Sequence, residues 1–127
     1  MNNSIIHQAL SEKVLGLAFT VHNVLGPGLL EHCYQEALCI ELKRNSILFE
    51  REKIFALHYR GECIGGYRAD LVVDNKIILE LKSVKELNPC MEAQTINYLR
   101  LSKVPVGYLM NFNGQRLVWK RFAYQRE

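Results

Sequence analysis

The stretch that most constrains the fold of this chain runs from Tyr67 to Val84 and reads YRADLVVDNKIILELKSV. Its two apolar runs predict a pair of β-strands joined near Asp74-Asn75. Three charged residues interrupt these runs, namely Asp70, Glu80 and Lys82. Because a buried ion without a partner costs several kcal/mol or more, these charges need partners, and a metal ion is one that would offset the cost.

Composition places the chain among ordinary globular proteins. Its 127 residues predict one domain, 1–127, and 49% of them are hydrophobic and 23% charged. No apolar run reaches the roughly 20 residues that cross a bilayer, so we expect no membrane association. The N-terminal MNNSIIHQALSEKV lacks the basic and apolar regions of a signal peptide, and we therefore expect a cytoplasmic protein.

The charge distribution is mildly basic. The formal net charge is +3, and four basic residues gather near the C-terminus: Arg116, Lys120, Arg121 and Arg126. Such a cluster is compatible with nucleic-acid binding, but taken alone it is more typical of a solvated strand face and tail.

The four cysteines form no CxxC pair and no zinc-ligand spacing; they are Cys33, Cys39, Cys63 and Cys90. Without a secretory signal, we expect them to be reduced and mostly buried. The four histidines are not in ligand spacing either, and we interpret them as structural or surface residues.

Hydrophobic periodicity predicts two helices first. Apolar residues recur every three or four positions from Ile6 to Leu25, the Gly26-Pro27-Gly28 segment breaks the pattern, and it resumes over Leu29–Leu42. A later helix is predicted over Pro89–Ser102, because Asn88 is a good N-cap and proline suits the first helical turn.

The remaining chain predicts five strands. The first is irregular near Glu50–Lys53, and the second carries a bend or bulge at Gly65-Gly66. Asn113-Gly114 is a hairpin signal between the last two. The strands are predicted over Phe49–Tyr59, Cys63–Val73, Lys76–Val84, Val104–Phe112 and Gln115–Phe122. The resulting order is α-α-β-β-β-α-β-β, a mixed α/β or α+β chain.

Strand geometry makes a sharp demand on the three charges. Glu80 and Lys82 are two residues apart and share a face of their strand. A two-residue loop at Asp74-Asn75 would place Asp70 opposite Leu79 and on the wrong face. We therefore predict an odd loop, such as one that includes Lys76, or a bulge, either of which pairs Asp70 with Glu80.

Carboxylates in this arrangement suit Mg²⁺ or Mn²⁺, which binds through one or two acids with water completing its shell. A neighbouring lysine can orient the attacking water and stabilise charge on a phosphate. The alternative is that Asp70 and Glu80 are edge charges and that Lys82 is their salt-bridge partner.

Three motifs resemble those of a nuclease superfamily. Asp70 followed by Glu80-Leu81-Lys82 is similar to the PD-(D/E)XK core, although Ala69 stands where a proline is usual. The segment from Gly28 to Tyr34 resembles the GxxExxY signature of small bacterial proteins in that superfamily. Gln94 and Tyr98 match the QxxxY motif of its RecB-like exonuclease branch.

This resemblance, which covers about residues 10 to 122, implies a restriction-endonuclease-like core. That core is a mixed sheet, made of a three-strand meander plus the C-terminal strands, flanked by helices. The resemblance also implies that Glu31 is an additional acid near the metal, that Gln94 orients the site, and that Tyr98 and Tyr34 contact nucleic acid. The competing expectation is a core Tyr98 and an exposed Gln94.

The sequence therefore favours a Mg²⁺- or Mn²⁺-dependent nuclease that acts on DNA. Asp70 and Glu80 would hold the metal and Lys82 the water. The alternative is a module that keeps the fold and binds nucleic acid or a partner protein without turnover. With little beyond a minimal core, grip on the substrate could come from a homodimer or a partner protein. A purely protein-binding domain has no positive feature in the sequence.

Overall fold

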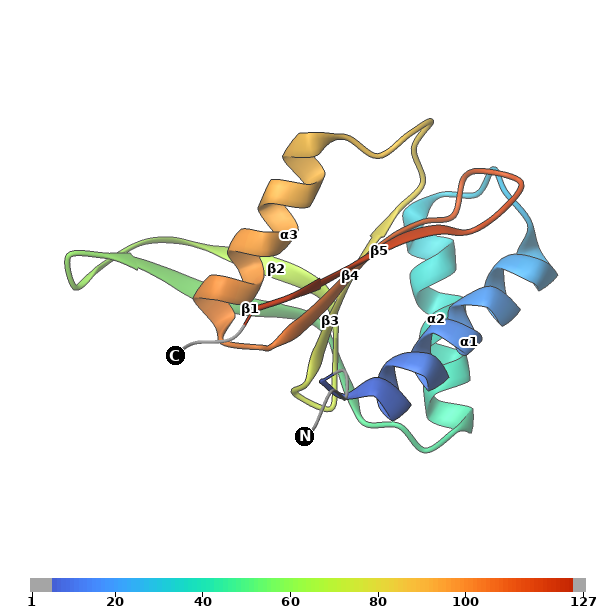
Figure 1. Ribbon diagram of the computed structural model, residues 1–127, viewed down its shortest axis with the longest axis horizontal. Coiled ribbons are helices and arrows are strands. Elements are labelled where there is room, and N and C mark those ends of the chain that lie inside the picture. Colours follow the sequence, from blue (N-terminus) through green and yellow to red (C-terminus); the bar gives the residue numbers. More distant parts are fainter. Residues whose placement is uncertain (1–5, 125–127) are drawn as a thin grey trace, which may run out of the picture.

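The computed structural model describes residues 6–124 and contains three helices and five strands in the predicted order (Figure 1). The helices are α1 (Gln8–Leu25), α2 (Glu31–Arg44) and α3 (Pro89–Ser102). The strands are β1 (Phe49–Tyr59), β2 (Glu62–Val73), β3 (Ile77–Lys82), β4 (Val106–Asn111) and β5 (Val118–Ala123).

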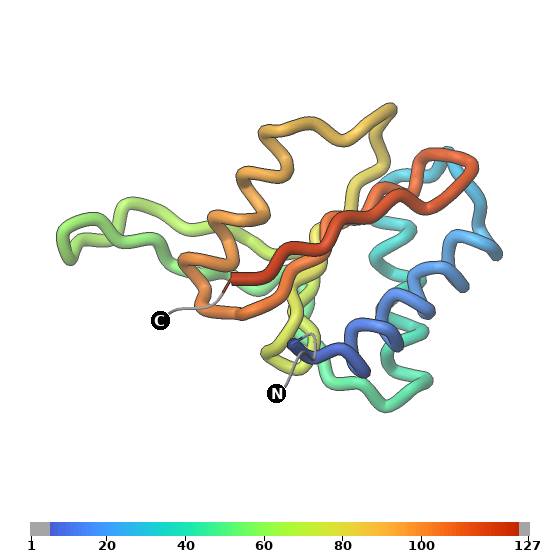
Figure 2. Tube along the Cα trace, in the orientation of Figure 1, coloured from blue at the N-terminus to red at the C-terminus, as the bar shows by residue number. Residues whose placement is uncertain are grey.

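The five strands form one mixed sheet in sequential order, β1-β2-β3-β4-β5. Neighbouring strands are antiparallel except β3 and β4, which are parallel because α3 carries the chain back across the sheet between them. The trace in Figure 2 shows this crossover above the sheet. The meander, the crossover and the C-terminal hairpin match the architecture that the sequence predicts.

Helices cover both faces of the sheet. α1 and α2 lie on one face, and α3 lies on the other (Figure 1). The odd-numbered positions of β3, such as Leu79 and Leu81, belong to the core under α1 and α2. Ile78 belongs to the core under α3. Because strand side chains alternate, Glu80 and Lys82 project toward the α3 side.

The helix ends follow the local signals. α1 stops at Gly26, whose φ of 70° is in the left-handed region that glycine adopts readily. The Asn88 side chain caps α3 by accepting a hydrogen bond from the Met91 amide at 2.9 Å, with Pro89 in the first turn. Both predicted boundaries are confirmed.

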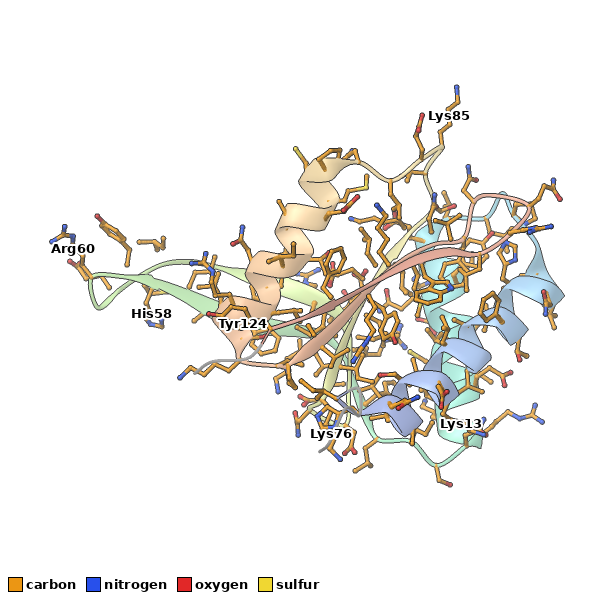
Figure 3. All side chains as sticks on the ribbon, in the orientation of Figure 1. Lys13, His58, Arg60, Lys76, Lys85 and Tyr124 are labelled. Atoms are coloured by element: carbon orange, nitrogen blue, oxygen red, sulfur yellow. The ribbon has the colours of Figure 1, made fainter. Side chains whose placement is uncertain are left out.

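The β1–β2 hairpin extends beyond the sheet as an arm (Figure 1), with His58 and Arg60 near its tip (Figure 3). Both predicted irregularities occur in it. Glu52 has a left-handed φ of 53°, and the register shifts at Leu57/His58, opposite Gly65. Phe49 belongs to the α1/α2 side whereas Phe55 belongs to the α3 side, so the strand changes faces around Glu52.

Two sequence expectations are wrong in detail. Asn113-Gly114 does not form a tight turn, because Asn111 pairs with Val118 and residues 112–117 make a wider loop. The cysteines are free but mostly exposed: only Cys39 is buried. Arg126 lies outside the described residues. Within 6–124, no helix is both long and apolar enough to cross a bilayer.

Candidate active site

The β2–β3 connection sets the register of the site. Val73 pairs with Ile77, so the loop consists of Asp74, Asn75 and Lys76. Asp74 and Asn75 have φ values of 50° and 54°, a left-handed conformation that both residue types tolerate. The predicted odd loop is confirmed, and continuing the register from Leu71↔Leu79 sets Asp70 opposite Glu80.

The two strands exchange unusual hydrogen bonds at this pair. The Asp70 amide donates to Glu80 Oε2 at 3.2 Å, and the Leu81 amide donates to Asp70 Oδ2 at 2.8 Å. Backbone amides that would otherwise continue the ladder are therefore satisfied by carboxylates. These bonds fix both acids at the point where the β2–β3 pairing ends.

The acid pair is electrostatically strained. Glu80 is only 5% exposed, and burial together with the nearby Asp70 charge raises the pKa of Glu80 from 4.5 to about 8. Burial also raises the pKa of Asp70, against the Leu81 hydrogen bond and the Lys82 charge. Like charges in a poorly solvated site disfavour the ionised forms, so the pair is suited to a compensating cation.

Lys82 lies two residues beyond Glu80 and shares its face of β3. It is half-buried. Its positive charge favours the ionised forms of both acids and so lowers the pKa of Asp70 and of Glu80. One lysine does not offset the burial of two carboxylates here, because the pKa of each acid remains above its ordinary value.

The carboxylates of the site supply part of the coordination shell of a hard divalent cation. Asp70 and Glu80 supply carboxylate oxygens from adjacent strands, and Mg²⁺ commonly takes one or two protein carboxylates with waters and substrate oxygens. Glu31, at the start of α2, is exposed but close enough for its charge to raise the pKa of both acids. Over the described part of the chain, no three acid, histidine or cysteine side chains gather as a ligand cluster.

Helix α3 brings Tyr98 to the same side of the sheet. The Tyr98 ring stacks on Tyr67 with centroids 3.7 Å apart, and the Tyr67 hydroxyl donates to the Tyr98 carbonyl at 3.0 Å. Burial raises the pKa of Tyr98, and the charges of Glu80 and Asp70 add to this. Tyr98 is half-buried, whereas Gln94, one turn earlier, is exposed.

Tyr34 does not have the position that the motif resemblance implies. Its side chain is fully buried, stacked on Phe112 with centroids 4.6 Å apart. Its hydroxyl donates to the Gly26 carbonyl at 2.7 Å and accepts from the Leu29 amide at 3.1 Å. The expectation that Tyr34 contacts nucleic acid is wrong, because these bonds tie the tyrosine to the corner between α1 and α2.

Sequence reasoning missed Tyr67 and Glu52 as neighbours of the acids. Tyr67 packs between Phe55 and Tyr98, and burial raises its pKa to about 12. Glu52 and Asp70 lie between the pairs Arg51↔Leu71 and Lys53↔Ala69 of the β1–β2 register, and the Glu52 charge raises the pKa of Asp70. In the sequence, Glu52 could have been noticed as a charged residue in the predicted irregular part of the first strand. No sequence feature singled out Tyr67.

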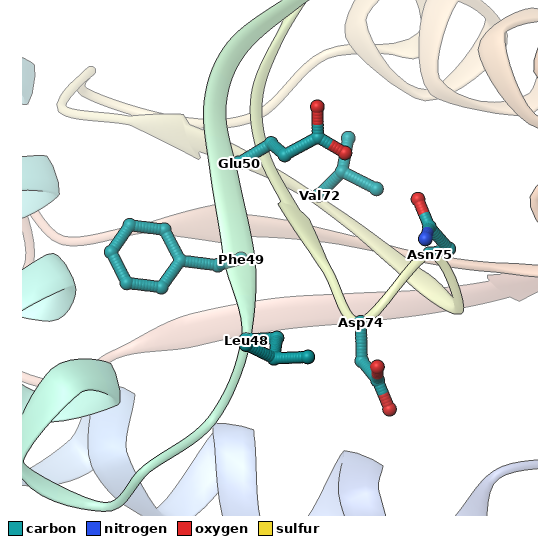
Figure 4. A pocket seen from close by; sticks show the side chains of 6 residues that line it. All are labelled: Leu48, Phe49, Glu50, Val72, Asp74 and Asn75. Carbon is teal, nitrogen blue, oxygen red and sulfur yellow. The ribbon is translucent and has the colours of Figure 1, made fainter.

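A hollow of about 250 Å³ is not centred on the acids. It lies beside the start of β1 and the β2–β3 loop, with Glu50, Val72 and Asn75 around it (Figure 4). Asp74 points away from the other side chains in this view. Neither Asp70 nor Glu80 lines this hollow.

Fold and site together define a class: an α+β protein with two carboxylates and a lysine on adjacent strands of a mixed sheet. The family model for the PD-(D/E)XK nuclease superfamily matches residues 8–122. The chain belongs to this superfamily, whose members generally use divalent metals. No curated protein sequence matched the chain.

A solved structure supports the fold. The chain is similar to the crystal structure of SSO0001, with a TM-score of 0.54 and 23% identity. The match covers 76% of this chain and 50% of that one, so the chain spans half of SSO0001. At this identity, the likeness extends to the fold alone.

Proposed function

We propose that this protein is a divalent-metal-dependent nuclease that hydrolyses phosphodiester bonds in DNA. The observation that carries the proposal is the odd β2–β3 loop, which pairs Asp70 with Glu80 and keeps Lys82 on the same face. Membership of the superfamily supports the same reaction class.

In this proposal, Asp70 and Glu80 hold Mg²⁺ or Mn²⁺. When bound, the cation supplies charge neutralisation at the phosphate and makes water a better nucleophile. Lys82 holds the attacking water by hydrogen bonding and stabilises the negative charge that develops on the phosphate oxygens. Burial raises the pKa of both acids and so disfavours their ionised forms. A bound cation would offset that cost and would displace the protons that otherwise neutralise the acids.

The flanking helices would complete the site. Glu31 would assist as an additional acid near the metal, and Gln94 would orient the site. Tyr98 would lie beside the nucleic-acid backbone, held by its stack on Tyr67. The GxxExxY and QxxxY signatures support assignment to the small bacterial branch with RecB-like features.

The test is cleavage of single-stranded DNA, double-stranded DNA and RNA with Mg²⁺ or Mn²⁺. Parent protein is expected to cleave DNA, and Glu80→Ala and Lys82→Ala proteins are expected to lose cleavage. Glu62→Ala, which removes an exposed carboxylate from the arm, is the matched control. Cleavage that survives both active-site substitutions would refute this mechanism.

The second candidate is binding without turnover, either to nucleic acid or to a partner protein. It is favoured by the two-acid donor set, since no third ligand joins it among residues 6–124. Calorimetry with Mn²⁺ separates the candidates. DNA binding without Mn²⁺ binding would favour the non-catalytic module, and Mn²⁺ binding lost in Glu80→Ala would favour the nuclease.

A further inference from the structure

A second cavity lies on the opposite face of the sheet from the acid pair. It has a volume of about 190 Å³, is partly open, and is lined by the first two turns of α1 together with β4 and β5. Tyr108, in its wall, belongs to the core under α1 and α2, whereas Glu80 alternates with Leu79 and Leu81 of that core and so projects to the α3 side. The cavity is therefore separate from the proposed nuclease site.

Two buried polar atoms at this cavity have no hydrogen-bond partner within the part of the chain that the structure describes. They are Ser11 Oγ and Arg121 Nη1. Ser11 is only 3% exposed. Each such group destabilises the fold by about 1–3 kcal/mol unless its hydrogen bond is accepted, so an occupant with acceptor atoms would stabilise both.

Other contacts hold the Arg121 guanidinium in the position that leaves Nη1 without a hydrogen-bond partner. Its Nη2 donates to the Ile6 carbonyl at 2.8 Å, and its guanidinium lies 5.9 Å from the centre of the Tyr108 ring. Lys120, the adjacent basic residue, instead turns outward to Glu92, with Nζ 2.7 Å from the carboxylate. Of these two residues, only Arg121 carries its charge into the cavity. The interpretation of the basic cluster as a solvated strand face therefore does not explain the position of Arg121.

The remaining walls define the size and charge of the occupant. Tyr108 and Trp119 meet at a tilted angle, with ring centroids 5.8 Å apart, and offer apolar surface. A cavity of about 150 Å³ holds a benzene ring, so this one accepts a ring with a small substituent. Glu12 also lines the cavity and opposes a second negative charge on the occupant.

We propose that this cavity binds a small planar monocarboxylate. One carboxylate oxygen accepts from Arg121 Nη1, the other accepts from the Ser11 hydroxyl, and the ring lies against Tyr108 and Trp119. A single negative charge matches the free guanidinium donors. A phosphate dianion would meet the Glu12 carboxylate and lacks an apolar body for the aromatic wall.

The test is titration of the full chain with benzoate, followed by the Trp119 indole and Ser11 amide signals in nitrogen–proton NMR spectra. Saturable shifts are expected at both. Ser11→Ala should weaken binding roughly tenfold, the loss of one hydrogen bond to a charged group. Arg121→Gln should weaken it more, and Arg116→Gln, an exposed arginine in the β4–β5 loop, should not change it.

Three outcomes would overturn the proposal. The first is the absence of saturable shifts, which would mean that water alone occupies the cavity. The second is equal binding of benzamide or inorganic phosphate, which would show that neither charge nor ring is recognised. The third is equal weakening by Arg116→Gln, which would indicate non-specific attraction. If Arg121→Gln does not fold, Ser11→Ala decides, because it removes only a buried hydroxyl.

Discussion

Glu80→Gln isolates the electrostatic cost of the acid pair. The substitution keeps the shape of the side chain and an acceptor for the Asp70 amide, but it removes the charge. Glu80 is buried beside Asp70, so without a metal its ionised form is destabilised. We expect the Gln protein to be more stable than the parent at neutral and basic pH when no divalent cation is present.

The magnitude follows from the raised pKa. A group whose pKa is about 8 in the folded protein and 4.5 in the unfolded chain binds a proton more tightly when folded. Its contribution to stability is complete below pH 4.5 and is lost as pH rises through 8. The loss reaches about 4 kcal/mol at pH 8 and is only about 1 kcal/mol at pH 5. Water entry and relaxation reduce such penalties, so we expect a gain of about 2–4 kcal/mol at pH 8.

The assay is urea unfolding of parent and Glu80→Gln proteins at several pH values between 5 and 9, with chelator present. The stability difference should widen as pH rises. The Glu80→Gln protein should keep a smaller dependence of stability on pH, of the same sign, because burial also raises the pKa of Asp70. Exposed Glu62→Gln is the control. A difference that is constant with pH, or a parent that gains stability from pH 5 to 8, would refute the reasoning.

Three further predictions concern the metal and the backbone. Mn²⁺ at a hundred times its dissociation constant should stabilise the parent protein by about 2.7 kcal/mol in thermal unfolding. The Asp70→Asn protein should gain no stability from Mn²⁺. An equal gain in both proteins would mean that the ion binds elsewhere. Tyr34→Phe should cost about 1–3 kcal/mol in urea unfolding, because it leaves the Gly26 carbonyl and Leu29 amide without a partner, while exposed Tyr59→Phe should cost little. Glu52→Val should destabilise by about 1–3 kcal/mol whereas Glu52→Asn should not, since φ of 53° strains a β-branched residue; a more stable Val protein would mean that strand propensity outweighs this strain.

Local signals in the sequence determined the element order and half of the candidate site. The cap at Asn88, the break at Gly26-Pro27-Gly28 and the two-residue alternation of β3 depend on neighbours along the chain. The same alternation allowed the parity of the β2–β3 loop to be deduced from Asp70 and Glu80, and the structure contains that loop.

Only the tertiary structure decided which side chains are exposed. Tyr34 and Tyr98 both end short motifs. Tyr34 is covered by Phe112, which comes from the β4–β5 loop far along the chain, whereas Tyr98 stays half-buried on Tyr67. Arg121 and Lys120 are adjacent and equally basic, but one turns into a cavity beneath α1 and the other faces Glu92. Exposure is a property of the elements that pack around a residue, and those elements are distant in sequence.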